Sequence, residues 1–179
     1  MKMLQLRRAT PADAEQLTQW DADPDVISAT TDDNEPGARA FGGVDWREEL
    51  AQDADHSYHL IAELEGRAIG AMQIIDPHLE PSHYWGEIEP HQRAVDIWIG
   101  AAADRGRGYG AEMMRLAHEL CFGDPAVSAI VIDPLATNVR ALRFYARIGY
   151  EAVGPRMFGD DACMVLRLTR ERFEALRRD

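Results

Sequence analysis

The amino-acid sequence predicts an α/β fold in a single domain spanning residues 1–179. A length of 179 residues is typical of one domain. The composition, 46% hydrophobic and 28% charged, is that of an ordinary globular chain. About seven segments have strand-like patterns, and they are interspersed with segments of helical periodicity and no internal repeat. A sheet flanked by helices accommodates both patterns around one core.

The N-terminal third begins with a short strand and then becomes helical. Residues 4–8 form an alternating run, and Thr10-Pro11 has the N-cap and first-turn proline of a helix start. Trp20 follows at helical spacing and is expected in the core. Residues 21–43 are rich in Asp, Gly and Pro, which favours a long loop with a broken helix. Another helix is expected within residues 45–53.

The middle of the chain contains three strand-like runs. Residues 58–64 and 68–75 are joined by Glu65-Gly66-Arg67, which is typical of a hairpin. Residues 94–100 alternate strictly, so the aliphatic side chains point one way and Asp96, Trp98 and Gly100 the other. A carboxylate in such a strand is costly unless it is paired or used.

The C-terminal part alternates between helices and strands. We expect a helix over 108–122, a buried strand over 129–132, a helix over 138–148 capped by a glycine at 149, a strand pair at 150–153 and 163–168 connected through 159–161, and a last helix from about 170.

Composition excludes several classes of protein. The formal charge of −12 and pI near 4.9 argue against general nucleic-acid binding. No apolar run is long enough to cross a membrane. The N-terminus lacks the apolar core of a signal peptide, and the two cysteines form no CxxC pair, so we expect a cytoplasmic protein with reduced thiols. HExxH is absent, and no metal site is expected.

The charge is unevenly distributed. Residues 21–55 contain 11 acidic and 2 basic side chains, whereas residues 105–156 contain 7 basic and 5 acidic ones. The first segment suits a cation and the second an anion, although acids on a loop-rich surface also serve solubility alone.

A glycine-rich turn leads from the strand at 94–100 into the helix at 108–122. Its sequence, RGRGYG over residues 105–110, allows several N–H groups to converge at a helix N-terminus, where the macrodipole favours an anion. The turn thus has the properties of a diphosphate cradle, to which Arg105 and Arg107 could add charge. Its spacing matches neither a Rossmann fingerprint nor a P-loop.

Together these motifs resemble the GNAT superfamily of acetyl-CoA-dependent N-acetyltransferases. The resemblance rests on Arg105, Gly108 and Gly110 of the [RQ]xxGx[GA] signature, and on the downstream run NVRALRFYARIGY over 138–150. It implies a GNAT-like domain with a central mixed, mostly antiparallel sheet, and a protein that is a monomer or homodimer. The implied cofactor-binding residues are Ile97, Trp98, Ile99, Arg105, Gly106, Arg107, Gly108, Tyr109, Gly110 and Asn138.

The sequence is similar in particular to the aminoglycoside 6'-N-acetyltransferases, which confer antibiotic resistance. The runs VDIWIG, FGDPAV and DPLATNVRALRFYARIGY carry this similarity. It places Asp96 opposite the acceptor amine and implies catalytic roles for Asp96 and Tyr145. The implied substrate-binding residues are Asp96, Asp133, Asp160 and Trp85 of the Tyr84-Trp85 pair. Glu87 or Glu89 could bind a polycation together with Asp133 and Asp160 through charge-assisted hydrogen bonds. An acid expected before that pair is absent, and Thr30-Thr31 stands where the group has tryptophans.

Chemistry supports these roles. Asp96 can hold an ammonium group and accept its proton, directly or through water. Backbone N–H groups along 97–99 can bind the pantetheine arm and stabilise an oxyanion. The hydroxyl of Tyr145 is a proton donor for the departing thiolate. Each residue also has a structural explanation: Asp96 as partner of an arginine, Asp133 as a turn residue before proline, and Tyr145 and Trp85 as core.

The leading functional hypothesis is acetyl transfer from acetyl-CoA to a cationic amine, in particular the 6'-amine of an aminoglycoside. The alternatives are acylation of a hydroxylated lysine in siderophore assembly, non-catalytic binding of acyl-CoA or antibiotic, and acetylation of proteins with basic tails.

Overall fold

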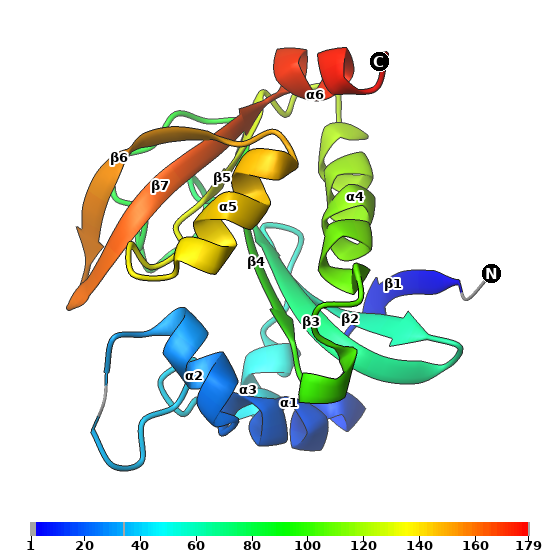
Figure 1. The fold of residues 1–179 in the computed structure, drawn as a ribbon, viewed down its shortest axis with the longest axis vertical. Helices are drawn as coiled ribbons and strands as arrows, with labels where there is room; N and C mark the ends of the chain where they lie inside the picture. The colour runs from blue at the N-terminus through cyan, green and yellow to red at the C-terminus, as the bar shows by residue number, and fades with distance from the viewer. Residues whose placement is uncertain (1–2, 34, 179) are drawn as a thin grey trace.

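The computed structural model describes residues 3–33 and 35–178. These residues contain a seven-stranded sheet in the order β1-β2-β3-β4-β5-β7-β6 (Figure 1). Neighbouring strands are antiparallel except β4 and β5, which are parallel. The expected mixed, mostly antiparallel sheet flanked by helices is confirmed.

The strands are β1 (Leu4–Arg8), β2 (Ser57–Leu64), β3 (Arg67–Ile75), β4 (Gln92–Ile99), β5 (Ala129–Ile132), β6 (Glu151–Phe158) and β7 (Asp161–Thr169). The α-helices are α1 (Ala14–Asp21), α2 (Pro24–Thr30), α3 (Trp46–Ala51), α4 (Tyr109–Phe122), α5 (Val139–Arg147) and α6 (Arg170–Leu176), and short 3-10 turns lie at η1 (Pro11–Asp13) and η2 (Ala102–Asp104).

The segment expected as a long loop with a broken helix contains the well-formed helix α2. Asp23 caps it by accepting hydrogen bonds from the N–H groups of Asp25 and Val26, and Pro24 occupies the first turn. This is the cap-then-proline pattern that also begins η1 at Thr10 and Pro11. The sequence signal for α2 was therefore present, although the surrounding Asp and Gly residues concealed it.

The two faces of β4 contribute to different parts of the core. Val95 packs with α4 in the larger cluster, together with Met113. Trp98 packs with Trp20 of α1 and Trp46 of α3 in a second cluster. The alternation expected for residues 94–100 is thus confirmed, and Asp96 lies on the face that carries Trp98.

The sheet opens between its two central strands. β4 pairs with β5 only from Gln92 to Ala94, while its pairing with β3 continues to Ile99. In Figure 1 the two strands diverge, with β1–β4 on one side and β5–β7 on the other. The edge of β4 beyond Ala94 is therefore left without a strand partner within the described part of the chain.

The C-terminal hairpin is longer than expected, because β6 extends to Phe158 and β7 begins at Asp161. Cys121 and Cys163 are free and buried, as expected. Among the described residues no helix is both long and apolar enough to span a membrane.

Candidate active site

Asp96 lies near the point where the sheet opens. It is half-buried on β4, between Ala94, which packs against Trp85 and Phe158, and Trp98, which packs against the N-terminal helices. Its carboxyl group makes no hydrogen bond or ion pair within the described residues. The arginine partner considered as an alternative is therefore not found there, and the carboxyl group is left available to a ligand.

Asp133 follows β5 on the other side of the opening. Its Oδ2 accepts a hydrogen bond of 2.7 Å from the hydroxyl of Tyr84. The ring of Tyr84 stacks on Phe158 of β6 with centroids 4.6 Å apart, which holds this hydroxyl in place. Asp133 is thus more than a turn residue, because a side chain from a distant loop is directed at its carboxylate.

The two carboxyl groups influence each other's ionisation. Burial and, secondarily, the negative charge of Asp133 raise the pKa of Asp96 to about 7. Burial also raises the pKa of Asp133, although the hydrogen bond from Tyr84 and the charge of Arg156 act in the opposite direction. Because Asp133 has these stabilising partners and Asp96 has none among the described residues, Asp96 is the more readily protonated of the two acids.

Tyr145 of α5 lies in the larger core cluster with Val95, on the face of the sheet opposite to Asp96. It is 9% exposed and packs edge-on against Tyr150, with centroids 5.6 Å apart. Burial, followed by the charges of Asp96 and Asp133, raises its pKa well above the usual value. Its hydroxyl therefore remains protonated at neutral pH and can donate a hydrogen bond.

The free edge of β4 presents backbone donors. The N–H of Gly100 bonds to the carbonyl of Ile69 on β3. Because hydrogen-bonding direction alternates along an antiparallel strand, the N–H groups of Ile97 and Ile99 face the opening and that of Trp98 faces β3. Of the three residues predicted on this strand, Trp98 therefore has its N–H committed to the sheet.

The glycine-rich turn ends at the N-terminus of α4. Gly106 and Gly108 have φ values of 72° and 86°, a left-handed conformation that favours glycine. The N–H groups of residues 106–110 donate no hydrogen bond within the described part of the chain. The turn and the first turn of α4 thus offer a set of converging, unused donors.

Two of the predicted cofactor residues have other partners. The N–H of Arg105 bonds to the carbonyl of Ala102, and its guanidinium group bonds to Asp23 and Asp25. The amide of Asn138 caps α5 through its oxygen and donates to the carbonyl of Ala29 at 3.3 Å. The expected charge of Arg105 is therefore directed at α2 and not at the cradle, because nearby carboxylates satisfy it.

Three predicted substrate residues differ in their accessibility. Trp85 is 4% exposed and packs edge-on against Phe158, so it belongs to the core. Asp160 and Glu87 are exposed. The charged groups that chiefly shift the pKa of Asp96 and Asp133 are Asp133 itself, Arg156 and Asp161. Neither Asp160 nor Glu87 is among them.

The structure brings forward two residues that the site prediction omitted. Tyr84, and not its buried neighbour Trp85, reaches Asp133. Asp161, and not Asp160, contacts the α2 region: its Oδ1 accepts from the Thr31 hydroxyl at 3.0 Å and raises the pKa of Asp133 by its charge. In both pairs the residue that makes the contact is the immediate neighbour of the one predicted to bind substrate.

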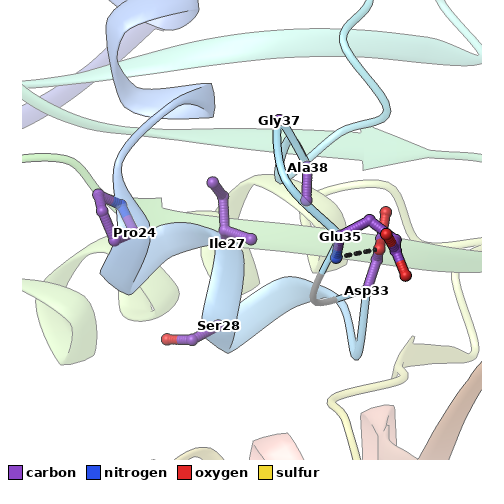
Figure 2. Close-up of a pocket in the computed structure, with 7 residues that line it drawn as sticks. All are labelled: Pro24, Ile27, Ser28, Asp33, Glu35, Gly37 and Ala38. Carbon is purple, nitrogen blue, oxygen red and sulfur yellow. Dashed lines mark hydrogen bonds between the residues drawn. The ribbon is translucent and has the colours of Figure 1, made fainter.

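An open pocket of about 240 Å³ lies in the acid-rich segment. Figure 2 shows Pro24, Ile27 and Ser28 of α2 on one wall and the loop after it on the other. In that loop Asp33 accepts a hydrogen bond from the N–H of Glu35 at 2.9 Å. The pocket combines a small apolar wall with carboxylates, and neither Asp96 nor Asp133 lines it.

Comparison with known proteins identifies the family. The family model described as acetyltransferase (GNAT) domain matches residues 9–158. Aminoglycoside N(6')-acetyltransferase type 1 of Serratia marcescens is 35% identical over 130 residues, which are 72% of this chain and 64% of that protein. A kanamycin resistance protein of Rhizobium radiobacter is 35% identical over 102 residues, 56% of this chain and 94% of that protein. The match thus spans less than two thirds of the Serratia protein.

Solved structures agree over nearly the whole chain. Aminoglycoside acetyltransferase AAC(6')-Ib in complex with coenzyme A has a TM-score of 0.82 and 30% identity, covering 98% of this chain and 99% of that one. The same enzyme with coenzyme A and kanamycin has a TM-score of 0.82 and 29% identity, with the same coverage. Fold, motif order and sequence similarity lead to one conclusion: this chain belongs to the GNAT acetyltransferase family.

Proposed function

We propose that this protein transfers the acetyl group of acetyl-CoA to the 6'-amine of an aminoglycoside. The observation that carries the proposal is the half-buried pair of Asp96 and Asp133 beside the free edge of β4. Relatives named as aminoglycoside 6'-N-acetyltransferases, and a structural neighbour solved with coenzyme A and kanamycin, support the choice of substrates. Two buried, free cysteines suit a reducing compartment, and we place the reaction in the cytoplasm.

The acceptor amine would arrive protonated and be held by the carboxyl pair. A bound ammonium group stabilises the carboxylate of Asp96 and so brings its pKa back down. Once the proton has left the ammonium group, this lowering ends, and the pKa of Asp96 returns to about 7, its value in the ligand-free protein. Asp96 can therefore accept the proton of the amine, directly or through a water molecule, without a large free-energy cost. Asp133, held by Tyr84, would remain ionised and orient the polycation.

The acetyl donor would lie in the opening between β4 and β5. The free N–H groups at residues 106–110 would bind the diphosphate, and those of Ile97 and Ile99 would bind the pantetheine arm and the tetrahedral oxyanion. As the new C–N bond forms and the C–S bond breaks, Tyr145 would provide the proton for the departing thiolate.

We expect Tyr145→Phe to lower kcat about 10²-fold with little change in either KM, the usual contribution of a general acid. Unchanged kcat would remove Tyr145 from the mechanism.

A matched pair of substrates tests the proposal. Neomycin and paromomycin differ at the 6' position, where the first has an amine and the second a hydroxyl group. We expect release of free thiol from acetyl-CoA with neomycin and kanamycin and none with paromomycin, and an acetylated 6'-nitrogen by NMR of the product. Absence of turnover with neomycin and kanamycin, or equal turnover with paromomycin, would contradict the assignment.

A further inference from the structure

Arg105 connects the cofactor-binding turn to the helix on the acceptor side. It is the first residue of the family's glycine-rich signature, yet its guanidinium group lies against the N-terminus of α2. Nη1 is 2.5 Å from Oδ2 of Asp25, and Nη2 is 2.9 Å from Oδ1 of Asp23. The side chains of Arg105 and Asp23 are 19% and 31% exposed, so water screens their ion pair only partly, whereas the more exposed Asp25 is screened more strongly.

The same guanidinium group also holds the end of β4. Nε donates to the carbonyl of Ile99 at 3.1 Å, and Nη2 donates to the carbonyl of Gly100. All three nitrogens of the side chain therefore have acceptors, two at the end of β4 (Ile99 and Gly100) and two at the N-terminus of α2 (its cap Asp23 and Asp25). The planar fork of arginine makes such a four-acceptor contact possible, whereas the single ammonium group of lysine cannot reproduce it.

Helix α2 depends on polar contacts for its position. Its only buried side chain is that of Val26. At its N-terminal end Asp23 is both the helix cap and a partner of Arg105. At its C-terminal end the carbonyl of Ala29 accepts from Asn138, and the Thr31 hydroxyl donates to Asp161. With so little apolar area buried, loss of the arginine contact is not compensated by packing.

The C-terminal end of α2 is connected to Asp133 through Asp161. Asp161, which accepts from Thr31 and from the N–H of Asp32 at 2.7 Å, is one of the charges that act on Asp133. We call Thr31, Asp32, Asp133 and Asp161 the acceptor-binding wall, because Asp133 is proposed to bind the cation. A shift of α2 would move the contacts of this wall and so change the electrostatic environment of Asp133. It does not alter the N–H groups at residues 106–110, which belong to the turn and to α4.

We infer that the side chain of Arg105 is a positioning residue for the acceptor: it fixes α2 and thereby the acceptor-binding wall, although it belongs to the donor-binding motif. This inference rests on the proposed function for the identity of the acceptor. The contact itself is independent of it. A substitution that removes the guanidinium group is thus expected to weaken binding of the acceptor and to leave binding of acetyl-CoA unchanged.

Steady-state kinetics separate the two effects. We expect Arg105→Met, which keeps the aliphatic stem, to raise KM for kanamycin at least tenfold while KM for acetyl-CoA changes less than threefold. Arg105→Lys should recover part of the loss. Arg115→Met is the matched control, because Arg115 also binds two carboxylates, Glu112 and Glu119, but on the exposed surface of α4. In this control variant, KM for kanamycin and KM for acetyl-CoA should both stay within twofold of wild type.

A double-mutant cycle assigns the effect to the contact. Asp25→Asn should also raise KM for kanamycin, and the Arg105→Met/Asp25→Asn variant should be little worse than Arg105→Met alone, because both changes break the same ion pair. Fully additive effects, or a rise in KM for acetyl-CoA that equals or exceeds that for kanamycin, would overturn the inference.

Hydrogen exchange gives a readout that needs no turnover. In the ligand-free protein, amides of residues 25–31 should exchange at least tenfold faster in Arg105→Met than in wild type, while those of β2 and β3 are unchanged. Unchanged exchange over 25–31 would overturn the inference even if the enzyme acetylates aminoglycosides. If wild-type protein acetylates none of them, the proposed function fails and the exchange result alone decides whether Arg105 positions α2.

Discussion

Replacing Asp96 with asparagine should make the protein more stable and inactive at the same time. The folded state raises the pKa of this carboxyl group from 3.8 to about 7. A shift of about 3 units corresponds to ~4 kcal/mol, because each unit is worth 1.36 kcal/mol. Since the folded pKa is the higher one, the folded state loses stability as pH rises from about 4 to about 7, and above pH 7 the full cost is present. Asparagine has nearly the same shape and does not ionise.

Chemical denaturation across pH measures this cost. We expect Asp96→Asn to raise the free energy of unfolding by up to about 4 kcal/mol at pH 8, and the difference from wild type to shrink as pH falls and to vanish at or below about pH 4. Glu15→Gln, which removes one exposed acid from α1, is the control for net charge and should change stability by less than about 0.5 kcal/mol.

The same variant tests the proposed chemistry. Turnover of kanamycin should fall below detection at pH 8, while the affinity for coenzyme A, measured by calorimetry, stays within about threefold, because Asp96 does not contribute to the cradle at residues 106–110. If Asp96→Asn destabilises the protein at pH 8, ionised Asp96 does not cost the folded state stability as described above. If the variant retains its turnover, Asp96 is not the catalytic base.

Two further substitutions address the site and the core. Tyr84→Phe removes the hydroxyl that stabilises ionised Asp133, so the pKa of Asp133 should rise further and Asp133 should hold the polycation less well. We expect kcat/KM for kanamycin to fall, and to fall most at the acidic end of its pH profile. An unchanged profile would mean that the charge of Asp133 does not contribute to binding of the acceptor. Gly100→Ala would place a Cβ 1.9 Å from Nε1 of Trp20, so we expect the free energy of unfolding to fall by at least ~2 kcal/mol and Tm to fall by about 5 °C or more. Gly110→Ala is the control: its Cβ would come no closer than 3.7 Å to its neighbours, and its Tm should fall by less than about 2 °C. A normal Tm for Gly100→Ala would show that Trp20 moves aside at little cost.

Local patterns predicted most of the elements. Strict alternation identified β4 and the direction of Asp96, helical periodicity identified α4, and the glycine after α5 was correctly read as its C-terminal cap, with φ of 106° at Gly149. These features depend on residues within a few positions of one another, so sequence reasoning can reach them.

Sequence reasoning is least exact where a partner lies far along the chain. The sequence predicts a long loop with a broken helix over residues 21–43, and α2 is well formed there, because Asp23 caps it and Arg105, 82 residues later, binds that cap. Asp160 stays a prediction as a substrate residue, and the structure adds its neighbour Asp161, which contacts Thr31. That contact joins residues 130 positions apart, so no local pattern indicates it.

The sequence by itself determined the family, the order of strands and helices, the glycine-rich turn, and the two acids on which catalysis is proposed to depend. Only the tertiary structure decided the ionisation of those acids, the hydroxyl group that holds Asp133, and the direction of the Arg105 side chain. The physical reason is that burial and charge–charge interactions depend on distances between groups from β4, β5 and the loops, which come together only when the sheet has formed.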